Sequence, residues 1–187
     1  MSLFHFKKGK DAKAVKEASL GVTRKYDLRP GKCYVVEEAP PSVSFDAFAN
    51  LVSTSDGGGG AVGLAVTRQH PDLVRQKYGL ERTPVYWLAT RAGEGVISPT
   101  NLGILTQTLV KFIGENADGV ILLDGLEYLV SNNDFGKVLK VIDQVHDHIS
   151  QSGSRFILPV DPRAFEPREL ALLERNMERI SGATDEG

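Results

Sequence analysis

The stretch that decides the fold is Val120-Ile-Leu-Leu-Asp-Gly-Leu-Glu-Tyr-Leu-Val130, in which an uninterrupted apolar run ends in a carboxylate. A buried strand of a parallel sheet has this pattern, because helices pack against both of its faces. Asp124 is then expected at the sheet edge where open α/β proteins bind ligands. In phosphate-handling proteins such a carboxylate holds Mg²⁺. Its usual companion, a GxxxxGK[ST] phosphate loop, does not occur in the 187 residues.

Strand-like and helix-like segments alternate on both sides of this stretch. Further strands are predicted at 33–36, 61–67, 84–88 and 155–160. Helices are predicted at 44–52, 71–78, 98–116, 134–151 and 166–180. Strands separated by helices form right-handed crossovers, so we expect an α/β fold of three layers, with a mostly parallel sheet and helices on both faces.

Capping signals place the starts of three of these helices. Ser44 is expected to cap the first, and Ser98 followed by Pro99 is a strong signal for the start of the long helix before Asp124. Glu166-Pro167 opens the last helix, and its apolar face is expected to run through Met177 and Ile180.

Charge is distributed unevenly along the chain. Residues 1–26 carry seven basic and two acidic side chains, a net charge of +5, which leaves −7 for the remainder because the total is −2. We therefore expect residues 1–30 to form a basic, partly disordered arm, residues 31–180 a single α/β domain, and residues 181–187 a flexible tail. A solvated arm is favoured, and contact of the arm with a membrane surface or a partner is the alternative.

Composition excludes several classes of function. Cys33 is the only cysteine, so a disulfide within the chain and a zinc site built on cysteines are excluded. No signal peptide and no apolar run of membrane-spanning length occurs, so a cytoplasmic location is expected and membrane association is not. The net charge of −2 does not favour a nucleic-acid binder.

Several blocks resemble an archaeal family known only as domain of unknown function 835. The resemblance rests on Thr83–Leu88, Ile97–Leu102, Gly119–Leu129, Asn133–Phe135, Ile157–Pro162 and Glu169–Glu174. It covers roughly residues 31–180. Domains of this family occur alone or attached to sensor and histidine-kinase modules, so the resemblance implies a signalling role and a protein partner. It implies no chemistry.

The order of the segments is also distantly similar to that of the KaiC-type branch of RecA-like ATPases. In that branch the phosphate loop lies between the first strand and its helix. Here that place holds Glu37-Glu-Ala-Pro-Pro-Ser-Val-Ser44. Two acids and two prolines do not form a nest of backbone N–H donors, and no lysine supplies positive charge. The resemblance therefore implies a RecA-like frame without its phosphate site.

Acids and arginines are expected to gather where the strands end. The set comprises Glu37, Glu38, Arg68, Arg91, Asp124, Glu127, Asp161 and Arg163. These side chains would either bind a small polar ligand or satisfy one another as an ion-pair network, and the network is favoured. No residue is assigned a catalytic role, and none a metal, except Asp124 if Mg²⁺ is bound.

Two other features are interpreted as structural. Gly57–Gly60 leads into a strand instead of opening a helix, so it is interpreted as a flexible turn and not as a phosphate loop. Tyr86 and Trp87 close a strand and are interpreted as packing residues, in preference to a base-stacking platform.

These observations favour a non-catalytic signalling or interaction module on a degenerate RecA-like frame. Such a module would dock a protein partner on a helical face. Binding of a small ligand at the Asp124 edge and self-association are further options. The alternative is a nucleotide- and Mg²⁺-binding enzyme that uses Asp124 for the metal and Arg68 or Arg163 for charge. A weaker alternative is an assembly protein that acts through its basic arm. No cofactor is assigned beyond that optional nucleotide or Mg²⁺.

Overall fold

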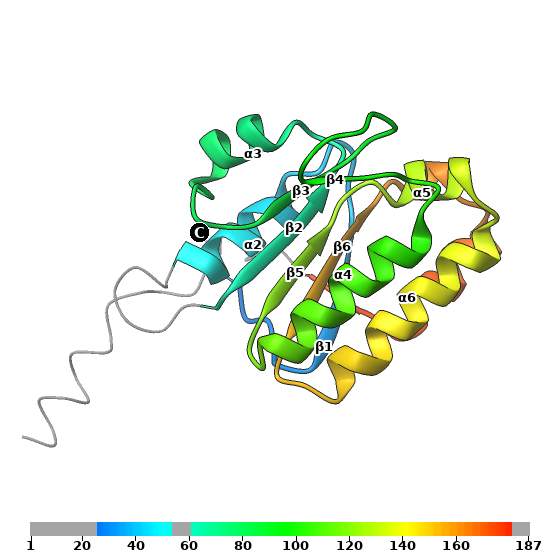
Figure 1. The fold of residues 1–187 in the computed structure, drawn as a ribbon. Helices are drawn as coiled ribbons and strands as arrows, with labels where there is room; N and C mark the ends of the chain where they lie inside the picture. The colour runs from blue at the N-terminus through cyan, green and yellow to red at the C-terminus, as the bar shows by residue number, and fades with distance from the viewer. Residues whose placement is uncertain (1–25, 54–60, 181–187) are drawn as a thin grey trace, which may run out of the picture.

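A seven-stranded parallel sheet forms the centre of the molecule in a computed structural model that describes residues 26–53 and 61–180 (Figure 1). Its strands lie in the order β4-β3-β2-β5-β6-β1-β7, and all neighbouring pairs are parallel. The strands are β1 (Lys32–Glu37), β2 (Gly63–Thr67), β3 (Val85–Leu88), β4 (Val96–Ile97), β5 (Val120–Leu123), β6 (Arg155–Val160) and β7 (Glu178–Arg179).

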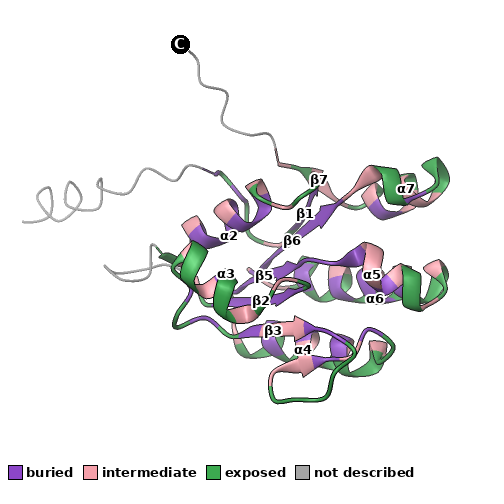
Figure 2. Ribbon diagram, turned by 90° about the horizontal axis from the view of Figure 1, so that it is seen from above, coloured by how far each residue is buried: buried purple, intermediate pink, exposed green. Residues whose placement is uncertain are grey.

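Helices cover both faces of this sheet (Figure 2). Residues of α4, α5, α6 and α7 belong to the core on one face, and residues of α2 and α3 to the core on the other. The helices are α2 (Val43–Ser53), α3 (Pro71–Tyr78), α4 (Leu102–Glu115), α5 (Leu126–Asn132), α6 (Phe135–Ser150) and α7 (Pro167–Glu174), with a 3₁₀ turn, η2, at Pro162–Ala164. The predicted α/β fold, with three layers and helices on both faces, is confirmed.

Strand β5 shows why this sheet is buried on both sides. Ile121 and Leu123 pack into the core under α4 and α6, whereas Val120 and Leu122 pack into the core under α2. All four side chains are fully buried. An apolar run without polar alternation is required where both faces of a strand are covered.

Two predicted helix boundaries were wrong. The long helix before β5 begins at Leu102, because Asn101 and not Ser98 caps it, and the Asn101 side chain accepts a hydrogen bond from the N–H of Ile104. Ser98-Pro99-Thr100 lies in the preceding turn.

The last helix also ends earlier than predicted. It stops at Glu174, and the chain then forms β7, which pairs with β1 at the edge of the sheet. Met177 and Ile180 therefore pack against opposite faces of the sheet instead of sharing one helical stripe.

The predicted arm and tail lie mostly outside the described residues, and the described end of the arm belongs to the domain. Most of the predicted arm, the Gly57–Gly60 turn and the tail 181–187 lie outside the described residues. Tyr26 and Leu28, assigned to the arm, are buried in the core under α2, so the structured domain extends to at least Tyr26. No helix in the described part of the chain is long and apolar enough to cross a bilayer.

Candidate functional site at the strand ends

Asp124 lies directly after β5 and is almost fully buried, with 7% of its surface exposed. Its Oδ2 accepts a hydrogen bond of 2.6 Å from the hydroxyl of Thr67, which ends the neighbouring strand β2. The backbone N–H of Arg68 and the side chain of Gln69 also favour the charged form of this carboxylate. Burial nevertheless raises the pKa of Asp124, and the charge of Glu38 contributes in the same direction. The carboxylate is therefore held by its neighbours instead of being presented to solvent.

Glu127 connects the end of β5 to the end of β6. It lies in the first turn of α5, a helix that the sequence analysis did not separate from the loop after Asp124. Its Oε1 accepts a hydrogen bond of 2.6 Å from the N–H of Asp161. Burial raises the pKa of Glu127, and the negative charge of Asp124 adds to the effect. The second predicted carboxylate is thus also engaged inside the protein.

Arg68 lies against Gly125, the residue that turns the chain from β5 into α5. Gly125 has φ of +108°, and a Cβ at this position would lie 2.5 Å from Cγ of Arg68, so only glycine fits here. The guanidinium lies 3.8 Å from the centre of the Tyr128 ring and donates a hydrogen bond to the carbonyl of Leu88. These contacts hold the cation in place.

Glu38 is the least expected member of this edge. Its carboxylate accepts hydrogen bonds of 2.8, 2.8 and 2.9 Å from the backbone N–H groups of Ser42, Val43 and Ser44, at the start of α2. Ser44, predicted as the cap, lies inside the helix instead, and its buried hydroxyl has no hydrogen-bond partner. The N–H groups at a helix start attract anions, and here a side chain of the same chain supplies the anion.

Comparison with known protein families assigns this chain to a family. Residues 48–177 match the family model described as protein of unknown function (DUF835). This chain belongs to the DUF835 family. A comparison with curated proteins finds no match.

Two solved structures share the fold of this DUF835 chain at low sequence identity. One is the PH0250 protein of Pyrococcus horikoshii OT3, with 14% identity, a TM-score of 0.56, and coverage of 82% of this chain and 84% of that one. The other is the KaiC-like protein PH0186 of the same organism, with 12% identity, a TM-score of 0.56, and coverage of 79% and 70%. The resemblance to the KaiC-like fold that the sequence indicated is therefore confirmed at the level of fold.

The residues at this edge do not fit a nucleotide with Mg²⁺. Glu38 fills the start of α2, where the KaiC-type order places the phosphate loop, and a second anion there would meet like charge. Asp124 and Glu127 already accept hydrogen bonds from Thr67 and Asp161. Within residues 26–53 and 61–180, no three or more His, Cys, Asp or Glu side chains are arranged to hold a metal ion. In this chain the strand-end acid is surrounded by groups of the protein that already use its acceptor positions and the helix start.

Glu37 and Arg163 lie outside this cluster, and Asp161 lies at its border, where its N–H bonds to Glu127. Glu37 forms an ion pair of 2.5 Å with Arg179 of β7, two strands beyond β6. Asp161 and Arg163 pair with each other through two hydrogen bonds of 2.8 Å, and this arginine lowers the pKa of Asp161. Arg163 has 78% of its side chain exposed. These groups form local ion pairs on the surface.

Arg91 lies away from the cluster as well, in a groove that was not predicted from sequence. The groove has a volume of about 520 Å³ and lies beside β3 and β4. Trp87 lines it and is half-buried, whereas Tyr86, the next residue, packs against the core under α4. The interpretation as packing is confirmed for Tyr86 and too simple for Trp87. Strand β4 has two residues, too few for any periodic signal, so the groove could not be read from sequence.

Proposed function

We propose that this DUF835 domain is a non-catalytic signalling and interaction module, which uses a KaiC-like frame as a scaffold for docking. One observation carries the proposal: the carboxylate of Glu38 occupies the three N–H donors at the start of α2. With those donors satisfied internally, the frame keeps its sheet and has no position for a phosphate chain. The family resemblance, with its attachment to sensor modules, supports the signalling part of the proposal.

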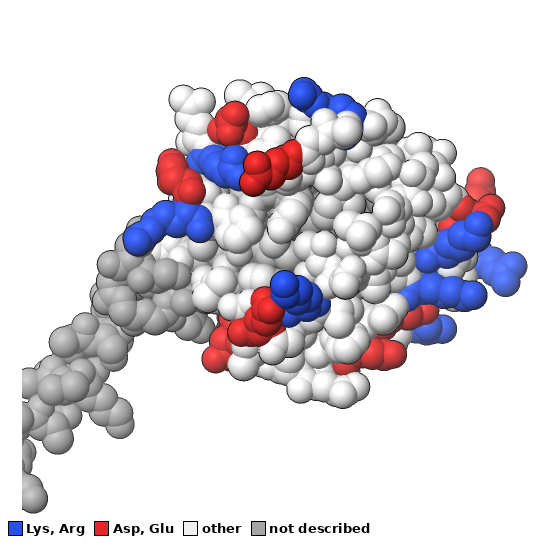
Figure 3. All heavy atoms as spheres, viewed as in Figure 1, with Lys and Arg blue, Asp and Glu red and all other residues white. Residues whose placement is uncertain are grey.

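A docking surface is offered by the outer faces of α4 and α6, here named the α4–α6 surface. The first charged residue of α4 is Lys111, in its tenth position, and Ile104 is 46% exposed. Figure 3 shows a largely uncharged area in this view, with basic and acidic side chains along its borders. A groove of about 480 Å³ runs between the helices, lined by Leu102, Gly103, Thr106, Gln107, Lys137, Lys140, Val141 and Gln144. An exposed helical face with as few charges as that of α4 is typical of protein interfaces.

The charges on α6 favour a second copy of this chain as the partner. Lys137 and Lys140 lie near the start of α6 on the groove side. Asp147 lies three residues beyond the groove-lining Gln144, so it continues the same stripe toward the end of the helix. If two copies pack with their α6 helices antiparallel about a two-fold axis, Lys137 of each lies opposite Asp147 of the other. The same surface would then be complementary to itself.

Analytical ultracentrifugation of the full chain tests this proposal. The wild-type chain should associate into dimers as its concentration rises. Lys137→Glu and Asp147→Lys should each weaken association about tenfold, because each reversal creates two repulsive pairs per dimer. The double variant should restore it, since the pairs are re-formed with exchanged signs. Lys77→Glu, a charge reversal in α3 on the opposite face of the sheet, is the matched control.

Two results would contradict the proposal. A chain that stays monomeric at all concentrations, or a double variant no better than the single ones, would remove the α4–α6 surface as the site of self-docking. Hydrolysis of a nucleotide with Mg²⁺ that disappears in Asp124→Asn would replace the non-catalytic module with the alternative enzyme.

A further inference from the structure

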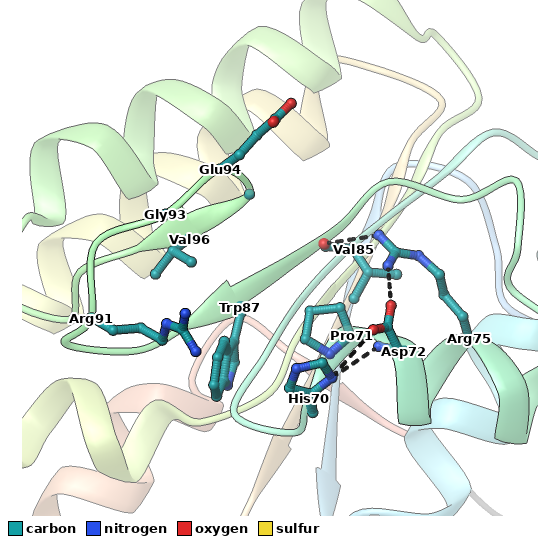
Figure 4. Close-up of a pocket in the computed structure, with 11 residues that line it drawn as sticks. His70, Pro71, Asp72, Arg75, Val85, Trp87, Arg91, Gly93, Glu94 and Val96 are labelled. Carbon is teal, nitrogen blue, oxygen red and sulfur yellow. Dashed lines mark hydrogen bonds and ion pairs between the residues drawn. The ribbon is translucent and has the colours of Figure 1, made fainter.

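The groove beside β3 and β4 exists because one face of the sheet has too few helices. Of the helices within residues 26–53 and 61–180, only α2 and α3 cover this face, and α3 has eight residues. Val85 is buried beneath α3, whereas Trp87, two residues further along β3, and Val96 of the edge strand β4 are only partly covered. The start of α3 forms one wall, and the loop between β3 and β4 forms the other (Figure 4). A volume of about 520 Å³ is in the size range of small-molecule sites.

The floor of the groove is a fixed aromatic platform. The indole Nε1 of Trp87 donates a hydrogen bond of 3.2 Å to the carbonyl of Arg68, which sets the orientation of the ring. The ring of His70 meets it edge-on, with centroids 4.9 Å apart and an angle of 61° between planes. Neither contact covers Trp87 completely, since the residue stays half-buried at the groove surface. A planar ring can therefore extend the stack on it.

The two arginines of the groove differ in how they are held. Arg75 forms an ion pair of 3.1 Å with Asp72 and also reaches the carbonyl of Val85. Arg91 has no carboxylate within ion-pair distance among the described residues, and its guanidinium lies 5.5 Å from the centre of the Trp87 ring. Glu94, on the same loop, points away from that ring, whereas Arg91 points toward it (Figure 4). The groove thus contains a cation that pairs with no acid in the described part of the chain.

We propose that this groove binds a small planar aromatic anion, with the ring stacked on Trp87 and the charged group paired with Arg91. A nucleoside monophosphate and an aromatic carboxylate share this chemistry, because guanidinium groups bind phosphate and carboxylate in the same bidentate way. Stacking and charge pairing act on different parts of the ligand. Removing either part should therefore weaken binding separately.

The single tryptophan makes the test specific. Because Trp87 is the only one in the chain, its indole N–H gives one resonance in a ¹H–¹⁵N NMR spectrum. Titration with AMP or phenylacetate should shift this resonance, and the tighter of the two identifies the preferred anionic group. Adenosine, without the charge, and ribose 5-phosphate, without the ring, should each bind about tenfold more weakly than AMP.

Two variants separate the proposal from weak surface binding. Arg91→Gln should bind AMP and adenosine equally well, because the charge pairing is gone and the ring platform remains. Arg168→Gln is the control, because Arg168 is an exposed arginine of α7, which packs on the opposite face of the sheet from the groove. This variant should keep the preference for AMP.

Absence of any shift with all four probes at millimolar concentration would overturn the proposal. So would an Arg91→Gln variant that still prefers AMP over adenosine. The groove and the α4–α6 surface lie on opposite faces of the sheet, so a failed titration leaves the docking proposal standing, and a monomeric chain leaves this one standing.

Discussion

Two regions of the same sheet carry an arginine beside an aromatic ring, and they differ in how completely their polar groups are satisfied. At the strand ends, Arg68 lies 3.8 Å from the Tyr128 ring and also bonds to a carbonyl. In the groove, Arg91 lies 5.5 Å from the Trp87 ring and has no acid partner among the described residues. The first region is closed by its own contacts, and the second is open.

The difference shows where a binding site can be sought in this fold. The strand ends hold more charged residues, yet Asp124, Glu127 and Glu38 each accept hydrogen bonds from neighbouring residues. Buried charges persist only when they are paired in this way. An incoming ligand would have to break those contacts, whereas a ligand in the groove would add contacts to a half-buried ring. A ligand in the groove would therefore displace fewer internal contacts than a ligand at the strand ends.

The largest effect is expected from opening the closed region at Glu38. Glu38→Ala leaves three N–H groups of α2 without their carboxylate, which should lower stability by about 2 kcal/mol. For a chain of this size the melting temperature should fall by about 4–8 °C. Added phosphate should then raise the melting temperature of the variant and not that of the wild type, because the helix start can accept an external anion.

Glu81→Ala is the control for this substitution, because Glu81 is exposed on a turn. It should change the melting temperature little, with or without phosphate. A Glu38→Ala variant with wild-type stability and no response to phosphate would show that the helix start is not the closed anion site inferred here.

Removal of the hydroxyl that holds Asp124 should have the next largest effect. Thr67→Val keeps the shape of the side chain and deletes the 2.6 Å hydrogen bond to a buried carboxylate, at a loss of about 1–2 kcal/mol in urea unfolding. Thr67 lowers the pKa of Asp124, so without it that pKa should rise further, and the loss of stability should grow from pH 5 to pH 8. Thr67→Ser, which keeps the hydroxyl, should stay close to wild type. Equal stability of the Val and Ser variants would contradict this account.

Asp124→Asn should have a smaller effect with a distinctive dependence on pH. Burial raises the pKa of Asp124 in the folded state above the ordinary carboxyl value of about 4. At a pH between these two pKa values, the folded chain binds more protons than the unfolded chain. Stability contributed by this group therefore falls as pH rises through that window. An asparagine can still accept the Thr67 hydrogen bond and carries no charge to bury. Its stability at pH 7 should lie within about 1 kcal/mol of wild type.

The measurement is the free energy of urea unfolding of both proteins from pH 4 to pH 8. The free energy of unfolding of the wild type should fall more steeply with rising pH than that of Asp124→Asn. Both proteins should keep the part of this fall that is due to Glu127, because burial raises the pKa of Glu127 too. Parallel curves would mean that Asp124 is not a buried, internally held carboxylate.

Much of the fold follows from sequence pattern alone. Strands β1, β2, β3, β5 and β6 lie within a residue or two of the predicted ranges, and α6 occupies Phe135–Ser150 where 134–151 was predicted. Long apolar runs and long series of apolar residues at helical spacing give strong signals, because both patterns reflect burial of the side chains. Strands β4 and β7 have two residues each, and α5 is preceded at its N-cap by Gly125, which has no side chain to cap the helix. Such elements are fixed by tertiary contacts and not by local pattern.

The membership of the candidate site was predictable in part, and the pairing of its residues was not. Sequence placed Asp124, Glu127 and Arg68 at one edge correctly, because strand ends converge in a parallel sheet. It could not show that Glu37 would pair with Arg179, since that pairing depends on the unpredicted β7. Nor could it assign Glu38 to the start of α2, because a carboxylate that reaches forward four to six residues has no sequence signature.

The smallest effects are expected from the same substitution, arginine to glutamine, made in each of the two regions. This pair of variants tests the comparison most directly. Arg68→Gln should lower stability by about 1 kcal/mol, since it removes a close cation–π contact and a hydrogen bond in a crowded turn. Arg91→Gln should change stability by less than about 0.5 kcal/mol, because the lost contact is long and lies at the surface. Urea unfolding of the two variants measures both values side by side. Equal losses would mean that the groove arginine is as firmly held as the strand-end one, and the contrast between a closed and an open region would fail.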